Sequence, residues 1–75
     1  MKVRRYIKDI ILECMSPEGC HAIDLIDEVS RKLGEPFSVQ RISSYLGVMF
    51  LGNEVQREPE VVAGVLRRYK WFKSD

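Results

Sequence analysis

The chain is poor in the residues from which active sites and metal sites are commonly built. It has a single histidine, His21, and two cysteines, Cys14 and Cys20. These are too few ligands for a structural zinc site, and their spacing matches neither a zinc finger nor a zinc ribbon. The chain also lacks a second histidine, a glycine-rich phosphate loop and a carboxylate pair at a distinctive spacing. We therefore expect that the protein is not an enzyme and holds no metal and no cofactor.

Long hydrophobic runs are also absent. The apolar face of Val3–Met15 is interrupted by charged side chains, whereas a membrane span needs about 20 predominantly apolar residues. The start of the chain has no signal-peptide pattern. We expect a cytoplasmic protein without a membrane partner, in which Cys14 and Cys20 are reduced and mostly buried. The alternative is a local disulfide across the turn between them.

No charge of one sign dominates. With 75 residues and a net charge of +1, residues 1–75 are expected to form one domain with one small core and no global basic field. Both ends are nevertheless basic, since residues 1–8 and 67–73 contain lysine and arginine but no acid. If the two ends lie on one side, they form a basic face that suits phosphate groups. If they do not, they are solvated ends, and the sequence leaves both interpretations open.

Three segments have the apolar spacing of amphipathic helices. The first is Lys2–Met15. The second, Asp24–Leu33, begins at the aspartate as its cap and ends before Gly34, a typical left-handed stop. The third, Val39–Leu51, follows Ser38, which has a capping side chain. These spacings predict three helices in succession.

Two further segments fit more than one structure. Cys20–Ile23 could be a short strand or the lead-in of the second helix. Pro59–Tyr69 fits a helix, with proline at its first position and an apolar face. The same residues also fit strands, because they are rich in valine and Gly64 could form a bend. We favour the helix, with Tyr69–Lys73 continuing as a short strand or tail.

These elements resemble the helix-turn-helix superfamily, and within it the small winged-helix DNA-binding domains of archaeal, viral or plasmid type. In one register, the positioning helix and its glycine turn are matched by Val29–Ser30 and Leu33–Gly34, and the recognition helix is matched by Ser38, Val39, Ile42 and Leu46. In a second register, Ile42–Val48 matches the positioning helix and Val62–Arg68 the recognition helix. The second register is similar to the helix-turn-helix tails of some viral and plasmid replication helicases and primases.

The resemblance implies a particular fold class. In the first register, Gly52–Arg57 resembles the first strand of a wing, and Val65–Phe72 resembles the returning strand. The implied fold is mostly α, with a three-helix helix-turn-helix core followed by a fourth helix or a short β-wing at the C-terminus.

The resemblance also implies double-stranded DNA as the partner. The protein would be a small transcriptional regulator or a replication or chromatin accessory factor, with its recognition helix in the major groove. Glutamine and arginine can pair with base edges, and serine, arginine and lysine suit phosphates. The predicted DNA-binding residues are Gln40, Arg41, Ser43, Ser44, Arg57, Arg67, Arg68, Lys70 and Lys73. An ordinary polar helix face and a solvated basic tail would show the same residues.

The alternative function is that of a winged-helix adaptor, which binds another protein and not DNA. The C-terminal aromatic segment, Tyr69, Trp71 and Phe72, could also form a homodimer or complete the core. A basic face shared by the arginines and lysines would favour DNA. An exposed aromatic patch would favour an adaptor or a dimer.

Overall fold

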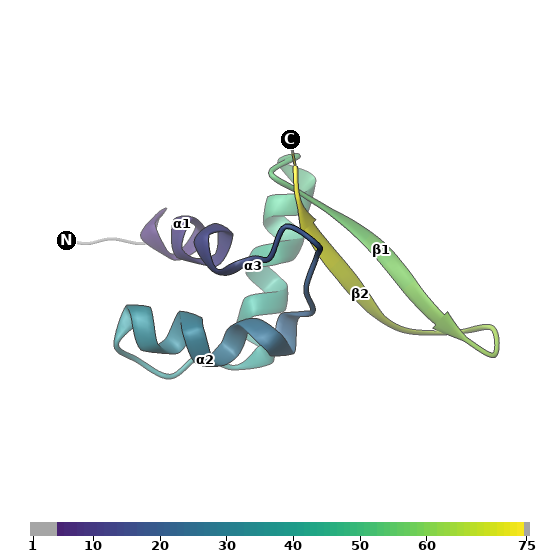
Figure 1. Ribbon diagram of the computed structural model, residues 1–75, viewed down its shortest axis with the longest axis horizontal. Coiled ribbons are helices and arrows are strands. Elements are labelled where there is room, and N and C mark those ends of the chain that lie inside the picture. The colour runs from purple at the N-terminus through teal and green to yellow at the C-terminus, as the bar shows by residue number, and fades with distance from the viewer. Residues whose placement is uncertain (1–4, 75) are drawn as a thin grey trace.

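The computed structural model describes residues 5–74, and side chains from Ile7 to Ser74 (Figure 1). Three helices come first and a pair of strands follows. The elements are α1 Arg5–Cys14, α2 Ala22–Leu33, α3 Val39–Leu51, β1 Val55–Val62 and β2 Val65–Lys73. Roughly half of the chain is helical and about a quarter is strand. The fold is therefore a small α+β fold, and the prediction of a mostly α class is wrong.

The helix ends follow from local hydrogen bonds. Ser38 caps α3, because its Oγ accepts the backbone N–H of Arg41 at 3.2 Å, as predicted. Gly34 ends α2 as predicted, with φ of 77° and its N–H donated to the carbonyl of Ser30. Asp24 does not stand at the cap position. The helix starts two residues earlier, and the Asp24 carboxylate accepts the backbone N–H of His21 from inside the first turn.

The core is formed by one stripe from each helix together with the base of the hairpin. The residues with almost no exposed surface are Ile11, Leu25, Val29, Ile42, Leu46, Met49 and Val55. Trp71 from β2 joins them with 5% of its surface exposed. Cys20 is buried beside this core, and both cysteines are free thiols. The alternative of a Cys14–Cys20 disulfide is therefore wrong.

The two strands form an antiparallel hairpin that projects away from the helices (Figure 1). Its ends are the pair Val55 and Lys73 at the base and the pair Val62 and Val65 at the tip. Between the tip residues, Ala63 and Gly64 both have positive φ values, 53° and 78°, as a two-residue turn of this kind requires. The base is held by Cys20, which pairs with Trp71 through two backbone hydrogen bonds of 2.9 and 2.7 Å.

The predicted fourth helix at Pro59–Tyr69 is wrong, because these residues lie in β1, the turn and β2. The second register of the resemblance fails with it, since Val62–Arg68 forms no helix. Two observations explain the strands. Folded back as a hairpin, the segment places Val55 and Trp71 in the core beside the helices. Pro59 is tolerated because β1 pairs with β2 alone, and a strand with an open edge can lack one N–H donor.

The turn before Cys20 depends on Gly19. Its φ is +100°, and a Cβ placed there would lie 2.5 Å from the Phe72 ring. Gly34 also has a positive φ, but a Cβ there would meet no atom within 4 Å. These two glycines therefore separate backbone strain from steric overlap.

We expect Gly34→Ala to lower the free energy of unfolding by about 1 kcal/mol, the cost of a left-handed conformation. Gly19→Ala should lower it by about 1–3 kcal/mol more, because overpacking against Phe72 is added to the strain. Urea denaturation of the two variants and the wild type measures this difference. Equal losses would contradict the close approach of Gly19 and Phe72.

Candidate functional site

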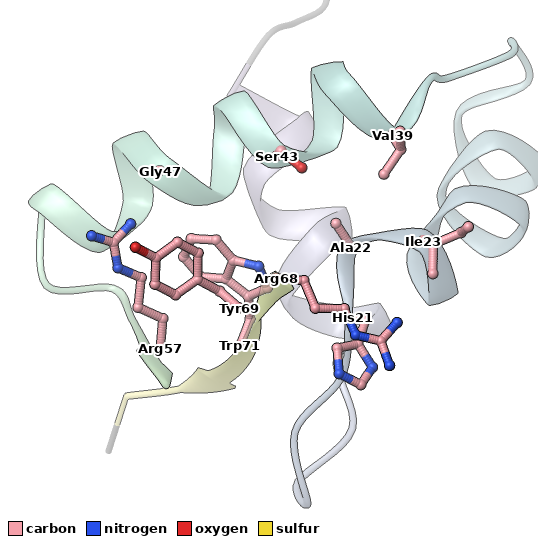
Figure 2. Close-up of a pocket in the computed structure, with 10 residues that line it drawn as sticks. All are labelled: His21, Ala22, Ile23, Val39, Ser43, Gly47, Arg57, Arg68, Tyr69 and Trp71. Carbon is pink, nitrogen blue, oxygen red and sulfur yellow. The ribbon is translucent and has the colours of Figure 1, made fainter. Parts of the chain in front are cut away.

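A pocket of about 490 Å³ lies where α3, the start of α2 and the hairpin meet (Figure 2). Most of its wall is apolar, with a few polar and charged groups placed among the apolar side chains. The ten lining residues are His21, Ala22, Ile23, Val39, Ser43, Gly47, Arg57, Arg68, Tyr69 and Trp71. They come from segments far apart in the sequence that the fold brings together.

One wall of the pocket is a single face of α3. Val39, Ser43 and Gly47 are spaced by four residues and therefore lie one above the other on the helix. Gly47 does not end the helix, which continues to Leu51. Apart from its chain neighbours and the backbone of its own helix, no atom lies within 4 Å of the position its Cβ would take. The missing side chain thus leaves open space, although glycine costs a helix interior up to about 1 kcal/mol relative to alanine.

The guanidinium of Arg57 is held by aromatic rings. Its central carbon lies 4.2 Å from the ring centroid of Phe50 and 4.2 Å from that of Tyr69. The Trp71 ring centroid lies 5.8 Å away. Such cation–π contacts fix the orientation of a planar guanidinium. Among the described side chains, no carboxylate lies within 4.0 Å of Arg57, so its charge is not neutralised locally.

Arg68, in contrast, is paired with an acid. Its Nε donates to the Glu60 carboxylate at 2.9 Å, and the same carboxylate oxygen lies 3.0 Å from His21 Nε2. The other ring nitrogen of His21 lies 3.5 Å from Asp24. The hydrogen bonds from His21 and then from Arg68 hold the pKa of Glu60 below its ordinary value. This group connects the middle of the hairpin to the start of α2.

The predicted DNA-binding residues of α3 lie on its surface. Gln40, Arg41, Ser43 and Ser44 are all exposed in the first half of the helix. Arg41 lies over the Phe37 ring, with its guanidinium carbon 4.1 Å from the ring centroid. Ser43 is the one of these that also lines the pocket. Ile42, Leu46 and Met49 form the buried side of α3. The solvent-facing side carries these polar residues in its first half and the exposed Val48 and Leu51 in its second half.

The predicted basic residues of the hairpin are not equivalent to one another. Arg67 and Lys73 are exposed and have no ion pair within the described residues. Arg68 is paired with Glu60, and Arg57 is held in the pocket. Lys70 is half-buried and lies over the Phe72 ring at 5.8 Å. The arginines of the N-terminal basic run lie outside the residues whose side chains are described.

The C-terminal aromatic segment does not form an exposed patch. Trp71 is 5% exposed, and Tyr69 and Phe72 are half-buried. Exposed apolar side chains gather instead around the hairpin tip, at Val61, Val62, Val65 and Leu66, which are between 49% and 59% exposed. The sequence alone did not place these four residues at a surface, because the segment was interpreted as a helix with a buried face.

The described residues do not form a metal site, a reactive thiol or a membrane-spanning helix. No cluster of histidine, cysteine and carboxylate side chains in residues 7–74 has the geometry to hold a metal ion. Burial raises the pKa of the Cys14 and Cys20 thiols, which makes them poor nucleophiles. Within the described part of the chain, no helix has the length and apolarity needed to cross a membrane.

The chain matches no protein-family model, no curated protein and no solved structure.

Glu60→Gln tests the ionic connection between the hairpin and α2. Because the folded pKa of Glu60 is depressed, its ionisation stabilises the fold above the unfolded carboxyl pKa of about 4.3. This stabilisation is lost as pH falls through the folded pKa. We expect the variant to be less stable than the wild type at neutral pH, with the difference disappearing in acid. Glu58→Gln, two residues earlier, removes an exposed carboxylate that forms no ion pair among the described side chains, and it should lose less stability than Glu60→Gln in urea denaturation at neutral pH. An equal pH profile for both variants would contradict the connection.

Proposed function

We propose that the protein binds double-stranded DNA, with α3 in the major groove and the hairpin beside it. The observation that carries this proposal is the exposed polar first half of α3, where Gln40 and Ser44 lie opposite the buried stripe and Ser43 lies on the side of the pocket. The major groove admits one α-helix, and glutamine and serine side chains can hydrogen-bond base edges or phosphates. The hairpin projects from the end of α3 (Figure 1), and in this proposal it makes a second contact with the duplex.

The exposed cations of the protein would make a modest electrostatic contribution to DNA binding. Arg41, Arg67 and Lys73 are exposed and have no acid partner among the described residues. Arg68 is paired with Glu60, and Arg57 and Lys70 are half-buried, so these three are weaker candidates for phosphate contacts. A net charge of +1 fits a binding mode with few phosphate contacts.

The order of three helices followed by a hairpin supports the resemblance to winged-helix domains. We therefore extend the proposal to a small transcriptional regulator or a replication or chromatin accessory factor. A cytoplasmic location belongs to the same proposal. The two free cysteines fit such a reducing compartment.

Fluorescence anisotropy of a labelled duplex, titrated with the protein at several salt concentrations, tests DNA binding. Three phosphate contacts predict a slope of log K against log salt of about −3. The double variant Arg67→Gln and Lys73→Gln should bring the slope to about −1. Gln40→Ala with Ser44→Ala should weaken binding and leave the slope unchanged.

Arg31→Gln serves as the matched control for this titration. Arg31 is an exposed cation in the last turn of α2, so its loss should leave the slope at its wild-type value. An absence of salt-dependent binding at low salt would overturn the proposal.

A second candidate function is protein binding through the hairpin tip. It rests on the four exposed aliphatic side chains Val61, Val62, Val65 and Leu66, since clustered exposed apolar groups often mark contact surfaces. A homodimer is the simplest case. It would form through this tip, because Trp71 of the aromatic segment is used in the core.

Sedimentation velocity over a range of protein concentrations tests this self-association. We expect a concentration-dependent dimer that Val62→Thr and Leu66→Thr together weaken by about tenfold, since each change removes apolar contact area. The exposed Val48→Thr on α3, a residue 55% exposed, provides the matched control. A monomer at every concentration would remove the homodimer from consideration.

A further inference from the structure

The pocket between α3 and the hairpin has the size of a small-molecule site. Its volume of about 490 Å³ falls within the range of about 300–1,000 Å³ typical of such sites. Ala22, Ile23 and Val39 form an apolar region on one side (Figure 2). Arg57, Tyr69 and Trp71 lie together on the other side (Figure 2). The pocket thus has an apolar part and a cationic, aromatic part.

Arg57 provides the polar group that would select a ligand. The contacts with Phe50 and Tyr69 position its guanidinium at 4.2 Å from each ring centroid. No carboxylate among the described side chains lies within 4.0 Å of it, and it donates no hydrogen bond to those side chains. A fixed guanidinium with available N–H donors matches the two oxygens of a carboxylate.

Arg68 does not compete for the same ligand group. The Glu60 carboxylate already accepts its Nε–H at 2.9 Å. Of the two arginines that line the pocket, only Arg57 therefore presents a charge that a ligand could neutralise. This difference predicts a ligand with one anionic group and not two.

Gly47 supplies the space for such a ligand. The position its Cβ would occupy has no atom within 4 Å, so no packing contact inside the protein requires a glycine there. Alanine or leucine at this position would favour the helix by up to about 1 kcal/mol. The absence of a side chain is explained if the space is occupied by something other than the chain itself.

We propose that this pocket binds a small organic carboxylate with an apolar body. The carboxylate pairs with Arg57, and the apolar body lies against Ala22, Ile23 and Val39. A backbone phosphate of a DNA duplex does not suit this site. It is bonded to polar sugars on both sides, and these would place no apolar group in the apolar part of the pocket. The proposal does not depend on DNA binding and is tested without DNA.

Sodium octanoate, kept below its micelle concentration, is the probe. Trp71 is the single tryptophan of the chain and lines the pocket, so its fluorescence reports occupancy. We expect a saturable change with octanoate. Acetate lacks the apolar body and octan-1-ol lacks the charge. Octan-1-ol should bind at least about tenfold more weakly, because a charge-assisted hydrogen bond accounts for a factor of this order. Acetate should also bind at least about tenfold more weakly, because it buries almost no apolar area.

Three variants complete the experiment, with saturation-transfer difference NMR of the octanoate chain as a readout independent of the tryptophan. Arg57→Met should weaken octanoate binding at least about tenfold. Gly47→Leu should weaken it by filling the pocket while the thermal unfolding midpoint is kept or raised. Arg31→Met removes an exposed cation of α2 away from the pocket and should bind as the wild type does.

The outcomes separate clearly. Loss of binding in Arg57→Met and Gly47→Leu, with binding kept in Arg31→Met, supports the proposal. If Arg57→Met does not fold, Gly47→Leu decides the question. The proposal is overturned if octanoate fails to bind the wild type, if octan-1-ol binds as tightly, or if Gly47→Leu folds and binds octanoate unchanged.

Discussion

The pairing of Cys20 with Trp71 is the contact on which the arrangement of the molecule depends. Two backbone hydrogen bonds, of 2.9 and 2.7 Å, attach β2 to the connection between α1 and α2. They place the Trp71 side chain in the helical core. The preceding glycine, Gly19, leaves room for Phe72 beside this pairing. With the base of β2 fixed in this way, the hairpin stands at a defined distance from α3, and the pocket is the space between them.

The helices were predictable because their signals are local. Ser38 and Gly34 act on the backbone within a few residues, and the buried stripe of each helix repeats at 3.6 residues. The hairpin was not predictable in this way. Its turn, Ala63–Gly64, lacks the Asn-Gly or Asp-Gly pair that marks such turns. Pro59 is a residue typical of the first position of a helix. The valines that follow it suit a helix face as well as a strand, so the sequence of this segment fits both structures.

The exposed side of α3 could be anticipated from the sequence, but the pocket could not. Gln40 and Ser44 lie outside the apolar stripe, and this position alone predicts exposure. The partners of Arg57 and Arg68 come from other segments. The register of β1 and β2 places Arg57 beside Tyr69 and Trp71, and Arg68 beside Glu60. The spacing of residues along the chain does not show which residues of the two strands pair. The sequence alone therefore could not distinguish the environment of Arg57 from that of Arg68.

The length of the hairpin has a mechanical consequence. β1 has eight residues, which span about 26 Å at 3.3 Å per residue. The hairpin therefore acts as a lever arm with its pivot at the Cys20–Trp71 pairing and a second attachment where Glu60 contacts His21. Trp71 pairs with Arg57, so five residues separate the pivot from Val62 at the tip, which is about 17 Å at 3.3 Å per residue. A rotation of about 10° at the pivot would displace the tip by about 3 Å. The stiffness of these two attachments together sets how accurately the apolar tip is positioned in space.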